Sequence, residues 1–139
     1  MSGASVADGQ IEQIVAAFED ASIDAAEFDH EAHLLVGWRF LQEQSLVDAI
    51  RRFTTALKRL TQKLGVPGKY HETITCFYLI KIAERCAGQA ASDWPTFKDA
   101  NPDLFTRNPS LIRQYYSKSL LASEDARRAF VLPDLGLKI

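Results

Sequence analysis

The chain has 139 residues, of which 47% are hydrophobic and 24% are charged. This is the length and composition of one globular domain with a core of its own rather than of a disordered chain. The formal net charge of −2 gives no electrostatic reason to expect nucleic acid as a partner, since binding to it needs a strongly basic face. No apolar run approaches the roughly 20 residues that a membrane helix needs, so we expect no membrane partner either.

The cysteines and the first residues favour a cytoplasmic protein. The N-terminal residues have neither the basic start nor the apolar stretch of a secretory signal. Cys76 and Cys86 fall in one expected helix, where a rise of about 1.5 Å per residue separates them by roughly 15 Å, too far for a disulfide. Two reduced thiols fit the cytoplasm, and we therefore predict a cytoplasmic location.

Four main helices are expected before residue 90. Residues 1–8 are small and polar, and we expect them to be flexible. Apolar residues at helical spacing then predict helices over about 10–20, 29–43, 45–64 and 70–87. Asp29 and Ser45 are suited to cap the second and third helices, because their side-chain oxygens can accept hydrogen bonds from first-turn N–H groups. Gly65 and Pro67 are expected to end the third.

The remainder of the chain is interrupted by prolines at 95, 102 and 109 and is expected to be mostly irregular. Asp93-Trp94-Pro95 predicts the start of one short helix, since proline suits the first helical turn. Two further helices are expected over 110–118 and from Ser123 to Phe130. No stretch shows strand alternation. The sequence therefore predicts an all-α fold: one single-domain helical bundle over residues 1–139, with about four main helices and short C-terminal ones.

All three histidines fall in two segments, Asp29-His30-Glu31-Ala32-His33 and Lys69-Tyr70-His71-Glu72. At about 100° per residue, His30 and His33 lie on the apolar face of the second helix. The same reasoning places His71 on an inward face of the fourth. Short connections make successive helices antiparallel, so the second and fourth would run parallel. We therefore expect the three imidazoles to converge at one end of the bundle.

Three convergent imidazoles are enough to bind a divalent metal and to leave one position open for water or substrate. Zinc, iron, manganese or nickel could each be accepted. Glu27 lies three residues before His30 and could add a carboxylate ligand or orient an imidazole. The sequence thus predicts a metal site of His30, His33 and His71, at which a metal would activate water or polarise a substrate oxygen.

Hydroxyl groups near His71 predict a polar pocket beside this site. Tyr70, Thr75 and Tyr78 surround it in the sequence, and hydroxyls that are buried together need partners. Two parallel helix N-termini would add partial positive charge at the same end. We therefore expect the pocket to take a small molecule, with an anion favoured, and we include Glu27 in its lining.

Two other interpretations are open. The histidines could serve as a metal-free acid or base in the same pocket. They could equally be packed and hydrogen-bonded as structural residues of a non-enzymatic interaction or regulatory module, because histidines at helix starts often cap the helix or bind carbonyls. That alternative predicts an exposed apolar patch and a homo-oligomer or partner complex. The sequence does not decide whether the protein is an enzyme.

Three parts of the chain resemble a family of small uncharacterised bacterial all-helical proteins. They are the segment Phe28-Asp29-His30-Glu31-Ala32-His33-Leu34, the segment Lys69-Tyr70-His71-Glu72-Thr73-Ile74-Thr75, and Tyr115-Tyr116-Ser117 with the stretch from Ala126 to Leu135. The resemblance spans most of the chain from about residue 28. It implies a bacterial, cytosolic protein and no particular activity, and it groups the two histidine segments as one unit.

Overall fold

The computed structural model describes residues 2–90 and 92–139, with side chains described from residue 8 onward. Its regular structure in that part of the chain is helical, apart from one isolated bridge between Arg107 and Ser110. The all-α prediction is therefore confirmed. Within the described ranges, no helix combines the length and the hydropathy needed to cross a membrane. The chain divides into two compact units, the first ending at Lys69 and the second beginning at Tyr70.

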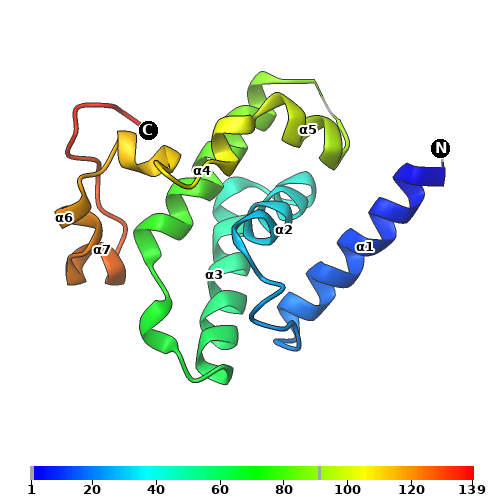
Figure 1. The fold of residues 1–139 in the computed structure, drawn as a ribbon, viewed down its shortest axis with the longest axis horizontal. Coiled ribbons are helices and arrows are strands. Elements are labelled where there is room, and N and C mark those ends of the chain that lie inside the picture. Colours follow the sequence, from blue (N-terminus) through cyan, green and yellow to red (C-terminus); the bar gives the residue numbers. More distant parts are fainter. Residues whose placement is uncertain (1, 91) are drawn as a thin grey trace. The chain divides into compact units, whose positions relative to one another are not determined.

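Three long helices form the first unit (Figure 1). They are α1 (Ser2–Glu19), α2 (His30–Glu43) and α3 (Leu46–Lys63), and the short 3₁₀ helix η1 (Pro67–Lys69) follows them. Each of the long helices contacts the other two. The Asp29 carboxylate accepts a hydrogen bond from the N–H of Ala32 at 2.9 Å, and the Ser45 hydroxyl accepts one from Asp48 at 3.3 Å. The second and third helices thus begin where their caps predict.

Aromatic rings fill the core of the first unit. The rings of Phe18 and Phe28 stack with centroids 4.7 Å apart, and Phe53 lies 5.0 Å from Phe18. Phe40 approaches Phe53 edge-on at 6.2 Å. All four side chains are buried. Because aromatic residues bury large apolar areas, this cluster packs the end of α1, the segment before α2 and the second half of α2 against α3.

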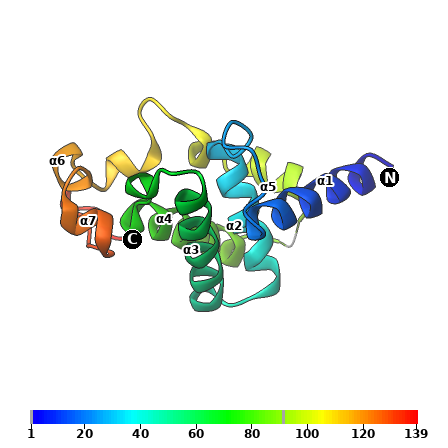
Figure 2. The ribbon, with the colours of Figure 1, turned by 90° about the horizontal axis from the view of Figure 1, so that it is seen from below.

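The second unit is built on one long helix and several short elements. These are α4 (Glu72–Gly88), α5 (Trp94–Ala100), η2 (Pro102–Phe105), η3 (Leu111–Gln114), α6 (Lys118–Leu121) and α7 (Glu124–Arg128). Figure 2 shows α6 and α7 side by side, and the two helices are in contact. Asp93, Ser117 and Ser123 each accept a hydrogen bond from the first turn of α5, α6 and α7. Helices this short are marginal alone, so the caps and tertiary packing stabilise them: α7 packs against α4, and α6 packs against α7.

The centre of this unit lies on the apolar face of α4. Phe77, Ile82, Leu104 and Tyr116 are fully buried there. The ring of Phe77 meets that of Tyr116 at right angles with centroids 6.0 Å apart. α4 therefore holds the segments that follow it by burying their side chains against its own.

The structure departs from the predicted elements at three places. α1 begins at Ser2 rather than near residue 10, so residues 2–8, expected to be flexible, are helical; Met1 lies outside the described residues. The helix expected over 110–118 is replaced by η3, a turn and the start of α6, because the Ser117 side chain caps α6. α4 begins at Glu72 and not before His71. A single four-helix bundle over residues 1–139 stays a prediction.

Candidate functional site

His30 and His33 belong to the first unit and are half-buried at the start of α2. The Nδ1–H of His33 donates to the backbone carbonyl of Asp29 at 2.8 Å, and its ring packs against that of Phe28 with centroids 4.0 Å apart. The hydrogen bond fixes the ring orientation at the edge of the aromatic core. In this position His33 stabilises the first turn of α2.

His71 belongs to the second unit, where it is the N-cap of α4. Its Nδ1 accepts a hydrogen bond from the N–H of Ile74 at 3.2 Å, and its Nε2–H donates to the carbonyl of Leu121 at 2.7 Å. This pattern assigns the neutral tautomer with the proton on Nε2. A metal-binding imidazole needs a nitrogen lone pair that no other group uses. As arranged here, His71 has none, and its role is to hold the start of α4.

The predicted orientation of His71 was wrong, because it assumed that the residue lies inside the helix. A cap residue has extended backbone (φ −136°, ψ 108°), so its side chain does not follow the 100° rotation of the helix. Among the described residues, no group of three or more His, Cys, Asp or Glu side chains is placed to hold a metal ion. The metal site of His30, His33 and His71 thus stays a prediction without structural support.

Two of the predicted pocket residues lie together at the start of α4. The Tyr70 hydroxyl donates a very short hydrogen bond to the Glu72 carboxylate, and the Thr75 hydroxyl donates to the carbonyl of His71 at 2.8 Å. The Cys76 thiol also lies 3.8 Å from Glu72. Burial, with the hydrogen bond and charge of Glu72, raises the pKa of Tyr70 well above its usual range. Tyr70 is therefore a neutral donor, and the cluster stabilises the first turn of the helix.

The other two predicted pocket residues lie elsewhere. Tyr78 is buried further along α4, where its ring meets that of Phe77 edge-on at 5.1 Å. Burial raises the pKa of the Tyr78 phenol, and hydrogen bonds to Ile112 and Ser110 oppose the rise. Glu27 is exposed in the loop before α2, in the first unit. Within the second unit, the structure thus brings Tyr70 and Thr75 together with His71 and places Tyr78 further along α4. The place of Glu27 in the pocket stays a prediction.

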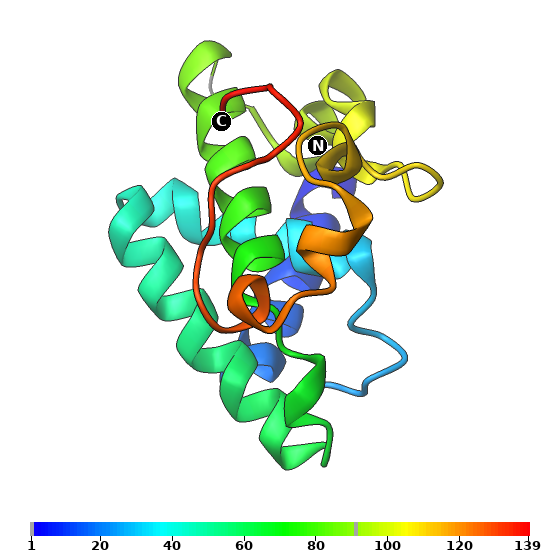
Figure 3. The same ribbon diagram turned by 90° about the vertical axis from the view of Figure 1, so that its left-hand side faces the viewer.

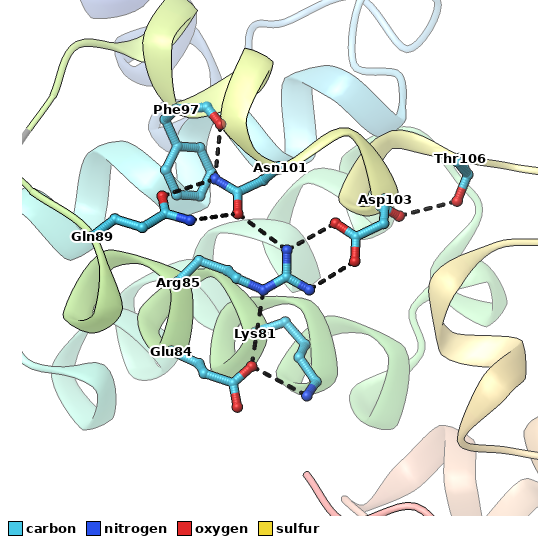
Figure 4. Close-up of polar contacts among 8 residues, drawn as sticks. All are labelled: Lys81, Glu84, Arg85, Gln89, Phe97, Asn101, Asp103 and Thr106. Atoms are coloured by element: carbon cyan, nitrogen blue, oxygen red, sulfur yellow. Dashed lines mark hydrogen bonds and ion pairs between the residues drawn. The ribbon is translucent and has the colours of Figure 1, made fainter.

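A polar network in the second unit, which the sequence did not reveal, joins α4 to the segment after α5 (Figure 4). Arg85 donates two hydrogen bonds of 2.8 Å to Asp103, and a third to the buried Asn101 at 3.1 Å. The Asn101 amide also exchanges two hydrogen bonds with Gln89 and donates to the carbonyl of Phe97. Hydrogen bonds from Arg85 lower the pKa of Asp103. Because these side chains hydrogen-bond to one another, the network holds the segment of residues 101–106 against α4.

Lys81 is a buried amine on the same helix, only 3% exposed. Its Nζ lies 4.5 Å from the centroid of the Tyr115 ring and 3.3 Å from the carboxylate of Glu84. An ammonium over an aromatic face is stabilised by the ring quadrupole. The lysine therefore stabilises η3 against α4. Its position among apolar residues of the helix was the signal that could have identified it from the sequence.

The C-terminal strap, residues 129–139, follows α7 without helix or strand and bends at residues 134–136 before it reaches the C-terminus (Figure 3). The Thr73 hydroxyl donates to the carbonyl of Ala129 at 2.8 Å and accepts from the N–H of Val131 at 3.2 Å. The Tyr116 hydroxyl donates to the carbonyl of Val131 at 2.6 Å. Burial raises the pKa of Tyr116 to about 12, so the phenol remains a donor at neutral pH.

A second set of hydrogen bonds holds the middle of the strap. The backbone N–H and the hydroxyl of Ser117 both donate to the Asp134 carboxylate, at 2.8 and 2.6 Å. The N–H of Leu135 donates to the carbonyl of Tyr115 at 3.1 Å. These contacts and those of Val131 bind the strap to the rest of its unit on both sides of Pro133. The strap is therefore a fixed part of the second unit.

Large apolar side chains project from this fixed segment. Leu132 is 75% exposed, Leu135 49%, Leu137 48% and Phe130 36%. Exposed apolar residues are usually scattered singly over a surface, whereas these four lie within eight consecutive positions. The strap thus exposes four large apolar side chains within a short stretch of the chain. Pro133 and Gly136 interrupt the leucines of the strap, so these residues show no helical or strand periodicity. The sequence pattern therefore could not identify the exposed leucines.

No family model, no curated protein and no solved structure matches this chain. The resemblance to a family of small bacterial helical proteins therefore stays a prediction. The geometry of the chain's own residues is what supports the function proposed below.

Proposed function

We propose that the protein is a non-enzymatic interaction module that associates with a second copy of itself through the C-terminal strap. The observation that carries this proposal is the exposure of four large apolar side chains on a segment held by hydrogen bonds. Water-exposed apolar surface is unfavourable, and contiguous patches of it on folded proteins mark interaction sites. A disordered tail could turn such residues away from water, but hydrogen bonds hold the strap in place, so its apolar side chains stay exposed to solvent.

The spacing of the exposed residues favours a second copy as the partner. Leu132 and Leu135 are equally far from the bond between residues 133 and 134, and so are Phe130 and Leu137. Two straps that meet in opposite directions about this point would bring residues 130–132 of one copy towards residues 135–137 of the other, so that apolar side chains meet apolar side chains. A two-fold interface uses the same surface on both copies and so requires self-complementarity of this kind.

The size of the patch sets the expected strength of the contact. The four side chains expose roughly 400 Å² together, about half of the ~800 Å² per partner in a standard stable interface. We therefore expect a reversible dimer with a Kd of about 10–100 µM rather than a permanent one. Such a dimer forms and dissociates with changes in protein concentration.

The hydrogen bonds of the histidines support the same proposal. Both ring nitrogens of His71 bind backbone groups of the second unit, and His33 binds a carbonyl and packs on a phenylalanine. This is the arrangement that a module with structural histidines requires. The metal-dependent enzyme is the competing proposal: a stoichiometric bound metal that is lost in His71→Ala would favour it.

Sedimentation velocity from about 5 to about 500 µM protein tests the self-association. We expect the sedimentation coefficient of the 139-residue chain to rise with concentration, and Leu132→Ser/Leu135→Ser to remain monomeric. Val47→Ser is the matched control, because Val47 is a 65% exposed apolar residue of the first unit. A wild-type chain that stays monomeric throughout, or a strap variant that dimerises as wild type does, would overturn the proposal.

A further inference from the structure

A groove of about 360 Å³ lies in the first unit, beside the end of α1 and along α3 from Asp48 to Arg59. Neither the histidines nor the strap contributes to it. Its polar lining includes Glu19, Arg51, Arg52, Thr55 and Arg59. Its volume falls within the range of small-molecule sites, about 300–1,000 Å³. The groove is therefore large enough for a small ligand but not for a folded partner.

Three of these residues form a ladder on one face of α3. Arg51, Thr55 and Arg59 are spaced four residues apart, which places them one above the other along the helix. The two arginine Cα atoms are about 12 Å apart at a rise of 1.5 Å per residue. Both side chains are long, and Thr55 lies between the two arginines along the helix. The ladder thus offers guanidinium and hydroxyl hydrogen-bond donors along the groove.

Two other charged residues of the groove, Arg52 and Glu19, are paired with each other. The Arg52 guanidinium donates to both carboxylate oxygens of Glu19, at 2.8 and 2.6 Å, and also to Glu43 and Gln44. The hydrogen bonds and charge of Arg52 lower the pKa of Glu19. This pair forms a fixed wall of the groove, and it leaves ligand binding to the ladder.

The guanidiniums of the ladder retain donors for a ligand. Arg59 uses Nη1 to bind the carbonyl of Glu19 at 2.8 Å, which positions its planar group at the end of α1. Arg51 is 76% exposed and approaches Asp48 only at 4.0 Å, at the limit of an ion pair. Guanidinium groups bind phosphate and carboxylate oxygens through paired hydrogen bonds. With three arginines against Glu19 and Asp48, the lining carries a net positive charge.

We infer that this groove binds the phosphate group of a small phosphate monoester between Arg51 and Arg59, with the Thr55 hydroxyl as a third donor. Donors that approach from two arginines and a hydroxyl suit a tetrahedral group with three free oxygens better than a planar carboxylate, which has two. The remainder of the groove accommodates the organic part of the ligand. Because the ladder is open to water, which screens its charges, binding is expected in the millimolar range.

The test is a titration followed by the amide resonances of α3 in the full chain, first with inorganic phosphate and then with phenyl phosphate and benzoate. We expect shifts confined to residues near 51–59, with phenyl phosphate binding more tightly than benzoate. Arg51→Gln is the main variant, because Arg51 supports little else in the fold. It should weaken binding about tenfold, a loss of roughly one charge-assisted hydrogen bond.

Arg113→Gln serves as the control, since it removes an exposed arginine of the second unit and leaves the net charge equal to that of Arg51→Gln. It should bind phosphate within a factor of about two of wild type. Three results would each overturn the inference: no α3 shifts with phosphate, equal weakening by Arg113→Gln, or benzoate binding as tightly as phenyl phosphate. Circular dichroism confirms that each variant is folded before titration.

Discussion

The Nε2–H of His71 donates to the backbone carbonyl of Leu121, which lies 50 residues later in the chain. The bond joins the cap of α4 to the last residue of α6. Since the other ring nitrogen accepts from Ile74, one neutral imidazole satisfies a helix N-terminus and a helix C-terminus together. Unpaired backbone groups at helix ends are costly when buried, so His71 contributes to the stability of the second unit.

Replacement of this histidine should destabilise the fold. His71→Ala removes both hydrogen bonds, and we expect the free energy of unfolding to fall by about 2 kcal/mol. His71→Asn keeps a capping acceptor and should lose about half as much. Urea denaturation at neutral pH measures both. Equal stability of wild type and His71→Ala would contradict the structural role.

The helices with local caps could be predicted from the sequence, whereas the surroundings of His71 could not. Asp29, Ser45 and Asp93 each bind an N–H only three residues away, so the signal lies within one helical turn. The predicted orientation of the His71 imidazole depended on the residue at which α4 begins. As the N-cap of α4, His71 binds the end of α6, whereas a residue in the first turn would have followed the helical rotation. A difference of one or two residues at the helix start therefore changed the orientation expected for the His71 side chain.

Contacts distant in the sequence explain the other features that were not predicted. Thr73 binds Val131 across 58 positions, and Arg85 binds Asp103 across 18. Helical periodicity describes only neighbours three or four residues apart, so it could identify neither pair. The arginines of α3 were visible in the sequence, but α1 contributes Glu19 to the groove, and only the packing of the two helices reveals that wall.

The strap should loosen when its phenol anchor is removed. Tyr116→Phe deletes the hydrogen bond to the carbonyl of Val131 and keeps the buried ring, so we expect a loss of about 1 kcal/mol in unfolding free energy. Amide hydrogen exchange should increase at Val131 and Leu135, whose N–H groups bind Thr73 and Tyr115, and remain unchanged in α2. Exchange that rises equally in both units would show a global effect and contradict a local anchor.

Stability should decrease in acid through Asp103. Hydrogen bonds and charge from Arg85 lower the pKa of this carboxyl in the folded state relative to the unfolded chain. Its stabilising contribution is therefore fully present above the ordinary aspartate pKa of about 3.9 and is lost as the pH falls through the lower folded value. Asp103→Asn should reduce stability by about 1 kcal/mol at pH 7, because the pair is half-exposed and screened.

The measurement for Asp103 is a series of urea midpoints between about pH 7 and pH 2. The difference in urea midpoint between wild type and Asp103→Asn should decrease to zero as the pH falls. Asp99→Asn is the control, since Asp99 is an exposed aspartate near the end of α5. A gap that stays constant at low pH would show that the ionised carboxylate is not the source of the stabilisation.

The pairing of Arg52 with Glu19 should depend on the shape of the guanidinium as well as on its charge. The Arg52 guanidinium donates two parallel hydrogen bonds to the Glu19 carboxylate, and its Cζ atom lies 3.9 Å from the centroid of the Phe40 ring. A lysine ammonium cannot form this pair of parallel hydrogen bonds, called the fork below, and it has no planar group to stack on the Phe40 ring. Arg52→Lys should therefore lower the free energy of unfolding by about 1 kcal/mol, even though the charge is retained.

Arg51→Lys is the matched control for this prediction, because it makes the same exchange at the neighbouring position without a fork. It should change stability by less than about 0.5 kcal/mol. Thermal unfolding in low and in high salt separates the contributions: salt screens the charge attraction but does not restore the planar stack on Phe40. The loss of thermal stability in Arg52→Lys relative to wild type should therefore be smaller at high salt, but it should not disappear. If the two variants unfold at the same temperature, the fork between α1 and α3 contributes no more than an ordinary surface ion pair.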